Sequence, residues 1–343
     1  MDTLSIFPTG DGRSVCALPV EAFPGFVANV YLILGGPVPV LVDCGSGTPE
    51  CRQQIEGRFE ELRDLIPNAP RLRDVGLALV THGHIDHFGG LPWIREITSA
   101  PSAVHALDRR VLSNYEERVV VASKHVELYL ESCGVSEATR RGLMELYLFA
   151  KGRYRSTPVD LEIVPGEATG ELAELAGPCE ALHVPGHCPG QVALRFGSVL
   201  LTADHVLSRT TPNQAPETIT QWTGLGHYFL ALDEIAAFAT DREIQIGLGG
   251  HEDAMEDVVS RVQKIRSLHQ RRLQRVLDIA DEPRSVREIS QRLFGPRRSY
   301  HVLLALCETG AHVEYLYQRG DLSVSNLDEV EKQHNPVLRY RRT

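Results

Sequence analysis

Runs of apolar residues alternate with amphipathic stretches along the first quarter of the chain. Residues 27–34 and 38–43 are two apolar, β-branched runs separated by Gly35-Gly36-Pro37, which predicts two strands joined as a hairpin. Residues 49–65 have the spacing of an amphipathic helix, and residues 75–81 form another strand. This order of elements predicts an α/β protein whose polar side chains gather at the ends of strands.

The pattern becomes helical over about residues 107–155, where Val111, Tyr115 and Val119 recur every four positions. We predict a helical insertion here, and both core packing and a lid over a functional site remain open as its role. Short apolar runs then predict further strands at residues 161–164, 181–184, 192–196, 199–202 and 244–248.

The last quarter of the chain is patterned differently. A charged helix over about residues 256–280 ends before Asp281-Glu282-Pro283, which predicts a boundary there. Two more helices, at 285–294 and 300–319, precede a polar tail, 321–340, that is expected to pair as a hairpin. We therefore predict a first domain at 1–257 and a second at 258–343, and the second resembles a winged-helix module.

Composition limits the classes of protein that fit. The chain has 343 residues and a net charge of −10, and no apolar run approaches the roughly 20 residues that span a bilayer. The start is polar and lacks a secretory pattern, so we expect a cytoplasmic protein without membrane contact. Seven cysteines without CxxC spacing suggest reduced thiols rather than disulfides or a thiolate zinc site.

Charge is divided unevenly between the two predicted domains. Residues 256–343 carry about +4, whereas residues 1–255 carry about −14. A basic C-terminal region keeps nucleic acid open as a partner, through arginines that could contact phosphates. Those arginines are Arg271, Arg272, Arg275, Arg284, Arg287, Arg292, Arg297 and Arg298.

The strand at 75–81 leads directly into the most informative segment, Thr81-His82-Gly83-His84-Ile85-Asp86-His87-Phe88-Gly89-Gly90. Three imidazoles and a carboxylate lie within six positions. The imidazoles repel one another when they are protonated, and binding a divalent cation in their neutral form avoids that repulsion. The segment therefore predicts a metal site.

This run resembles the signature of the metallo-β-lactamase superfamily, and three later segments match the family's order: Pro185-Gly186-His187, residues 200–205 and Gly249-Gly250-His251. The resemblance implies an αββα sandwich holding two divalent metal ions, with zinc expected and iron or manganese left open. It assigns His82, His84 and His187 to one metal, Asp86, His87 and His251 to the other, and Asp204 as the bridge. Asp43 is expected to orient a ligand imidazole, an ordinary turn aspartate being the alternative.

Overall the chain resembles glyoxalase-II-like hydrolases of this superfamily. The resemblance implies that a metal-bridging hydroxide attacks a thioester or related acyl ester. Asp86 is expected to orient the water and to pass its proton to the leaving group. Trp222, His227 and Tyr228 follow the bridging aspartate and are candidates for binding a small acyl substrate. Other activities stay open: an endoribonuclease or phosphodiesterase, a lactonase, a persulfide dioxygenase with one iron, or a ligand sensor without catalysis. A homodimer is also open.

Overall fold

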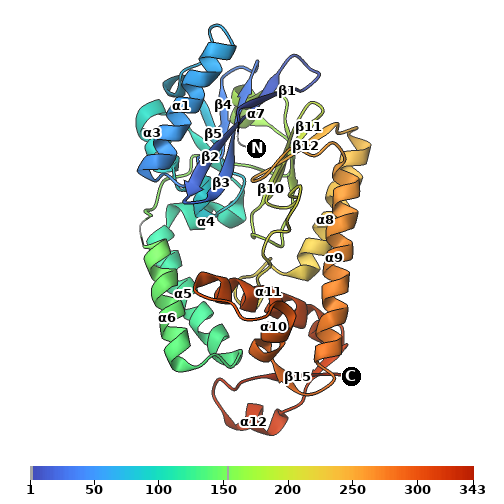
Figure 1. Ribbon diagram of the computed structural model, residues 1–343. Coiled ribbons are helices and arrows are strands. Elements are labelled where there is room, and N and C mark those ends of the chain that lie inside the picture. The colour runs from blue at the N-terminus through green and yellow to red at the C-terminus, as the bar shows by residue number, and fades with distance from the viewer. Residues whose placement is uncertain (1–2, 153) are drawn as a thin grey trace. The chain divides into compact units, whose positions relative to one another are not determined.

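A computed structural model describes residues 3–152 and 154–343 (Figure 1). The chain divides into two compact units. The first, the sheet unit, comprises Met1–Tyr115, Tyr154–Pro212 and Ala231–Val262, and the second, the helical unit, comprises Glu116–Arg153, Asn213–Leu230 and Gln263–Thr343. Most of the predicted insertion and the segment 213–230 thus group with the C-terminal residues, and Arg153 of that insertion lies outside the described residues. The boundary near residue 257 stays a prediction.

The larger sheet of the sheet unit has seven strands in sequence order, and the predicted hairpin forms its centre. Neighbours pair antiparallel as far as β4 and parallel from β4 to β7. The strands are β1 (Ser5–Pro8), β2 (Ser14–Phe23), β3 (Phe26–Leu34), β4 (Val40–Val42), β5 (Leu77–Leu79), β6 (Ser102–Val104) and β7 (Leu161–Glu162).

The smaller sheet has five strands in the order β12-β11-β10-β9-β8. Only the β11–β12 pair among its described strands is parallel. The strands are β8 (Gly166–Glu167), β9 (Glu180–His183), β10 (Val192–Phe196), β11 (Val199–Ala203) and β12 (Ile246–Gly249).

One apolar core joins the two sheets. Val15 and Ala17 of β2 belong to the same buried cluster as Leu194 of β10 and Leu201 of β11. Strand β4 is buried along its whole length, as expected for a strand covered on both faces. Helices α1 (Pro49–Leu65) and α3 (Leu91–Thr98) lie outside the larger sheet (Figure 1). The predicted αββα sandwich is therefore confirmed.

The helical unit has a core of its own, in which the predicted insertion packs against the C-terminal helices. Leu130 and Leu143 belong to one buried cluster with Val276, Ile289 and Leu306. Its helices are α5 (Tyr115–Ser132), α6 (Glu137–Lys151), α10 (Val286–Phe294), α11 (Tyr300–Gln318) and α12 (Leu327–Lys332), with most of α9 (Val258–Ile279).

A small antiparallel sheet in the order β13-β15-β14 completes the helical unit. Its strands are β13 (Arg284–Ser285), β14 (Leu322–Val324) and β15 (Arg339–Arg342), so the predicted pairing within the polar tail does occur. The remaining elements are η1 (Leu72–Asp74), α2 (Ile85–Phe88), α4 (Ala106–Ser113), α7 (Gly170–Ala176) and α8 (Leu225–Asp241). Across the described residues, every helix is too short or too polar to cross a bilayer.

Candidate metal centre

The histidine run leaves β5 and turns into the short helix α2, so His82 and His84 lie on a loop whereas Asp86 and His87 lie on the helix. The two glycines that end the run let it pack directly on the loop after β4. A Cβ at Gly90 would lie 2.0 Å from the carbonyl oxygen of Cys44, so a larger residue would push the run away.

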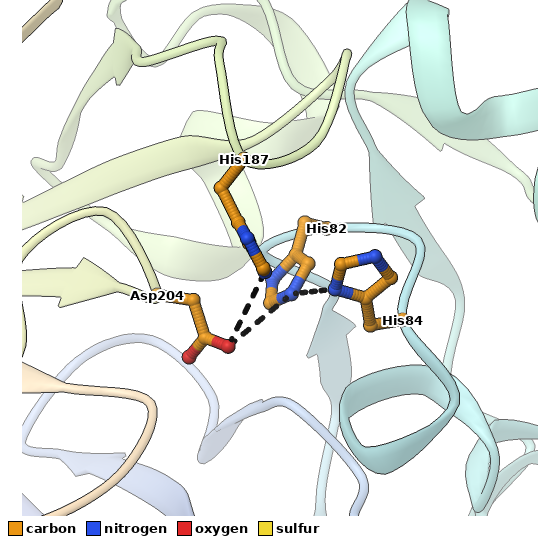
Figure 2. Close-up of side chains that lie close together, drawn as sticks. All are labelled: His82, His84, His187 and Asp204. Atoms are coloured by element: carbon orange, nitrogen blue, oxygen red, sulfur yellow. Dashed lines mark hydrogen bonds and ion pairs between the residues drawn. The ribbon is translucent and has the colours of Figure 1, made fainter. Parts of the chain in front are cut away.

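One group of candidate ligands comprises His82, His84, His187 and Asp204 (Figure 2). His82 Nε2 lies 3.1 Å from His84 Nδ1 and 3.8 Å from Asp204 Oδ2. His187 Nε2 lies 3.6 Å from the same carboxylate oxygen. Three separate stretches of the chain therefore direct their ligand atoms toward one point in the sheet unit.

A second group comprises Asp86, His87 and His251. His251 Nε2 lies 3.4 Å from Asp86 Oδ2 and 3.3 Å from Asp204 Oδ2, and His87 Nε2 lies 3.5 Å from Asp204 Oδ1. Asp204 is thus close to members of both groups. All seven residues that the sequence singled out as ligands lie together.

These spacings fit bound cations. Two ligand atoms each about 2.1 Å from a tetrahedral ion are roughly 3.4 Å apart, which is close to the separations observed. His87 Nε2 and Asp204 Oδ1 are buried and make no hydrogen bond within the described part of the chain, although they face each other. A Cβ at Gly250 would lie 2.3 Å from Asp204 Oδ1, so glycine leaves the space beside this oxygen open.

The charges of the cluster are strongly coupled. Burial by itself would raise the pKa of Asp204 and of Asp86, but neighbouring imidazoles outweigh burial and hold both pKa values below the ordinary range. Burial opposes the charged form of His251, yet Asp204 and Asp86 raise the pKa of His251 to about 10. His82 shows the reverse, since burial and the surrounding imidazoles lower its pKa. The carboxylates are therefore ionised and available as ligands.

Hydrogen bonds from the framework fix the orientation of the imidazoles. Asp43 Oδ2 lies 2.8 Å from His87 Nδ1, and Asp43 Oδ1 accepts from the Thr81 amide at 2.8 Å. His251 Nδ1 lies 2.7 Å from the carbonyl oxygen of Val27. In both His87 and His251 the contact at Nδ1 leaves Nε2 directed toward the cluster, as is usual for metal-binding histidines.

Two positions in the site have unusual backbone angles. Asp43 has a φ of 63° and Ala203, which precedes Asp204, has a φ of 47°. Left-handed angles are uncommon for residues other than glycine, and they concentrate at functional sites. Asp43 directly follows β4, and Ala203 ends β11 just before Asp204, so these angles lie where each carboxylate leaves its strand.

The sequence did not reveal three further residues at the site. Phe26 is 46% exposed, and its ring lies 4.6 Å from the ring of His251. Asn29 Nδ2 and Tyr31 Oη both donate to the carbonyl oxygen of Gly249, which holds the turn that carries His251. The signal available was a single buried asparagine inside the apolar run of β3.

The candidate substrate-binding residues belong to the helical unit, whereas the seven candidate ligands belong to the sheet unit. Trp222 is 44% exposed, and His227 Nε2 lies 3.0 Å from Glu217 Oε1. Tyr228 is fully buried, with its ring edge against the ring of His269.

A third group, His269, Glu308 and His312, also brings two imidazoles and a carboxylate together in the helical unit. Arg272 contacts Glu308 Oε1, and the Gln214 amide donates to Glu308 Oε2 at 2.7 Å, so both carboxylate oxygens are already engaged. A cation here would lie close to a guanidinium group. We therefore interpret this group as a buried hydrogen-bond network rather than a metal site.

Neutral tautomers let the two histidines share one hydrogen bond. His312 Nδ1 donates to the carbonyl oxygen of Glu308 at 2.6 Å, which leaves His312 Nε2 to accept from His269 Nδ1 at 3.1 Å. Burial lowers the pKa of His269 to about 2 and that of His312 to about 3. Protonation of His312 would break the shared hydrogen bond, because both facing nitrogens would then carry protons. Protonation of His269 would add an N–H at its buried Nε2, which has no hydrogen-bond partner among the described residues.

The helical unit is accordingly expected to lose stability in acid. Both histidines stay neutral in the folded chain while the unfolded chain takes up protons below pH 6.5, so stability is complete above that pH and falls toward about pH 3. The slope is up to about 1.4 kcal/mol per pH unit for each histidine. A Trp93→Phe variant leaves Trp222 as the fluorescent reporter of denaturant unfolding in this unit.

The matched comparison uses two histidine variants in that background. His269→Leu/His312→Leu is expected to flatten the pH dependence, whereas His125→Gln, at an exposed position of α5, should preserve it. Equal unfolding free energies at pH 4.5 and pH 7.5 in the parent would contradict the interpretation.

Comparison with known proteins agrees with the fold. The sequence model of the metallo-beta-lactamase superfamily matches residues 23–273. A metallo-beta-lactamase family protein from Thermus thermophilus is 27% identical, with a TM-score of 0.73, covering 96% of this chain and 98% of that one. A beta-lactamase domain protein from Burkholderia ambifaria is 22% identical, with a TM-score of 0.74 and coverage of 100% and 96%, which supports the fold.

One curated relative matches over a short stretch. It is described as a transcriptional regulator from Methanoculleus marisnigri and is 28% identical over 88 residues, which is 25% of this chain and 43% of that protein. The chain thus spans less than half the length of this relative.

An αββα sandwich with a cluster of histidines and aspartates at the ends of its strands is typical of a metal-binding protein. The chain belongs to the metallo-beta-lactamase superfamily, and the superfamily together with the cluster indicates a hydrolase that depends on divalent metal ions.

Proposed function

We propose that this chain is a dinuclear zinc hydrolase that cleaves thioesters or related acyl esters of small molecules. The observation that carries the proposal is the position of Asp204. Its Oδ2 lies 3.6 Å from His187 of one ligand group and 3.3 Å from His251 of the other, as expected for a carboxylate shared by two cations.

The chain's own residues divide into two sets around that carboxylate. One set would hold the cation that we term the first metal, and it consists of His82, His84 and His187. The other set would hold the second cation. The second set is Asp86, His87 and His251. When bound, the cations supply Lewis acidity that makes water a nucleophile near neutral pH and polarises an acyl carbonyl. Imidazole nitrogens and carboxylate oxygens without a thiolate suit zinc.

Asp86 is the candidate for moving a proton. Its Oδ2 lies among His87 and His251, and the imidazoles keep its pKa below the ordinary range, so at neutral pH it accepts a proton rather than donating one. It would take the proton of the attacking water and pass it to the leaving group. A thiolate leaving group needs little assistance from an acid, which favours thioesters.

The glyoxalase-II-like relationship, the cytoplasmic location and the winged-helix character of the C-terminal part belong to the same proposal. The three-stranded sheet β13-β15-β14 beside α10 and α11 supports a winged helix. Leu303, Leu306 and Val313 of α11 are buried in the core of the helical unit, which favours packing over DNA recognition as the role of this helix.

An endoribonuclease is the main alternative, and three of the arginines that suggested it are used inside the helical unit. Arg272 contacts Glu308, Arg275 donates to the carbonyl oxygen of Leu293, and Arg287 donates to that of Gly134. Groups engaged in this way are less available to phosphates. The alternative then depends on exposed arginines such as Arg297 and Arg298.

The test is a substrate panel on protein whose metals have been counted. The zinc-loaded chain is assayed with acyl-CoA, acyl-glutathione, lactone, phosphodiester and single-stranded RNA substrates. We expect two zinc ions per chain and turnover of at least one thioester. Turnover confined to RNA, or one iron per chain with oxygen uptake, would overturn the proposal in favour of a nuclease or a dioxygenase.

A further inference from the structure

Asp108 is a fully buried carboxylate that the sequence motifs do not include. It lies in the first turn of α4, directly after β6, and belongs to the sheet unit. Burying an ionisable group is costly unless hydrogen bonds satisfy it, so the partners of Asp108 indicate what the side chain is for.

Those partners come from both loops that carry the ligands of the first metal. Asp108 Oδ2 accepts from the Gly83 amide at 2.8 Å, and Gly83 lies between His82 and His84. Asp108 Oδ1 accepts from the Gly190 amide at 2.9 Å.

The second loop makes one further contact. Cys188 Sγ donates to Asp108 Oδ2 at 3.2 Å, and Cys188 directly follows His187. A single carboxylate therefore connects loops about a hundred positions apart in the sequence. Two backbone N–H groups and a weaker S–H donor converge on one carboxylate, so directional hydrogen bonds fix the separation of the loops.

Close packing leaves these loops little freedom to shift. A Cβ built on Gly190 would lie 2.7 Å from Asp108 Cγ, and one built on Gly83 would lie 3.4 Å from the same atom. His183 Nε2 also lies 2.8 Å from the carbonyl oxygen of Pro189, which gives the second loop a further supporting contact.

We propose that Asp108 is a positioning residue for the first metal, setting the distance between the His82–His84 pair and His187. The inference rests on the proposed metal centre. Among the described residues, no contact joins the side chain of Asp108 to the side chain of a candidate ligand. Its effect passes through the backbone of the two loops, and it would govern affinity for the first metal more than affinity for the second.

Two variants disturb the same contact in different ways. Asp108→Asn replaces an acceptor oxygen with an NH₂ group that faces a backbone N–H, and Gly190→Ala inserts a methyl group against Asp108. The matched controls lie in the same unit. Asp160→Asn alters a carboxylate that accepts from the Ser102 amide at 2.8 Å, and Gly57→Ala adds a methyl group to open space.

The experiment measures stepwise zinc affinity of the full chain by competition with a chromophoric chelator, and the absorption spectrum of the cobalt-substituted protein. Circular dichroism confirms that each variant is folded at the assay temperature. We expect Asp108→Asn and Gly190→Ala to weaken one of the two zinc steps by about 10- to 100-fold and to alter the cobalt ligand-field bands. The other zinc step and both controls should match the parent.

A merely structural role would lower thermal stability and leave zinc affinity of the folded protein unchanged, and that result in both variants would overturn the inference. If Asp108→Asn does not fold, Gly190→Ala alone decides. A parent chain that binds two zinc ions while both variants bind them equally well contradicts the role of Asp108 only. A parent that binds no zinc contradicts the proposed function itself.

Discussion

Replacing Asp204 by asparagine is expected to abolish hydrolysis and metal binding together. Asp204 Oδ2 lies 3.3 to 3.8 Å from candidate ligands of both groups, and the substitution removes the negative charge shared between them. Repulsion between two adjacent cations would then be left without compensation. We expect zinc affinity to fall by more than about 100-fold, beyond the effect of losing a supporting hydrogen bond. Elemental analysis and kcat/KM on the same preparation measure both quantities.

The control is Asp241→Asn, at an exposed aspartate that ends α8, which should retain parental metal content and activity. An Asp204→Asn protein that keeps two zinc ions and loses only activity would show that this carboxylate acts on the substrate instead of holding the metals. Full turnover by the variant without metal would contradict metal-dependent hydrolysis altogether.

Removal of residues 283–343 is expected to unfold the helical unit. This segment supplies a large part of that unit's buried cluster, including Ile289, Leu306 and Leu316, and its loss would expose Leu130 and Val276 to water. Each buried leucine or isoleucine contributes a few kcal/mol, whereas a domain is stable by only about 5 to 15 kcal/mol. Loss of the cooperative unfolding transition reported by Trp222 fluorescence measures the effect.

Two point variants of the full-length chain compare how much a buried and an exposed leucine of the helical unit contribute to its stability. Leu306→Ala, at a position 2% exposed, should lower the free energy of unfolding by about 2 to 5 kcal/mol. Leu327→Ala, at a position 66% exposed, should change it by less than about 0.5 kcal/mol. Truncated protein that unfolds with the parent's cooperativity would show that the helical core does not need its C-terminal part.

The candidate ligands could be identified from the sequence because they stand in short motifs that resemble those of the superfamily. His82 to His87 occupy one continuous run, and the turns around His187 and His251 contain glycine beside the ligand. Asp108 has no comparable signal. An acidic residue in the first turn of a helix is common, and its partners Gly83 and Gly190 lie 25 and 82 positions away.

Some strands could be predicted from the sequence pattern and others could not, for a similar reason. Strand β2 has buried residues in succession rather than in alternation, and Pro19 and Glu21 interrupt its apolar run, so the pattern did not indicate a strand. Periodicity predicted the helices at 107–155 but not their partner. An amphipathic face shows that a helix buries one side, and which surface covers that side depends on the tertiary fold.

The order of the ligands along the chain has a bearing on biosynthesis. His82 to His87 leave the ribosome roughly ten to thirty seconds before His251 at ordinary rates of translation. The first set of ligands is complete once Asp204 has been made, whereas the second set lacks His251 until the end of that interval, because the turn carrying His251 is held by β3 only after β12 has been made. Completion of the second group of ligands is therefore a late event in the synthesis of each new polypeptide.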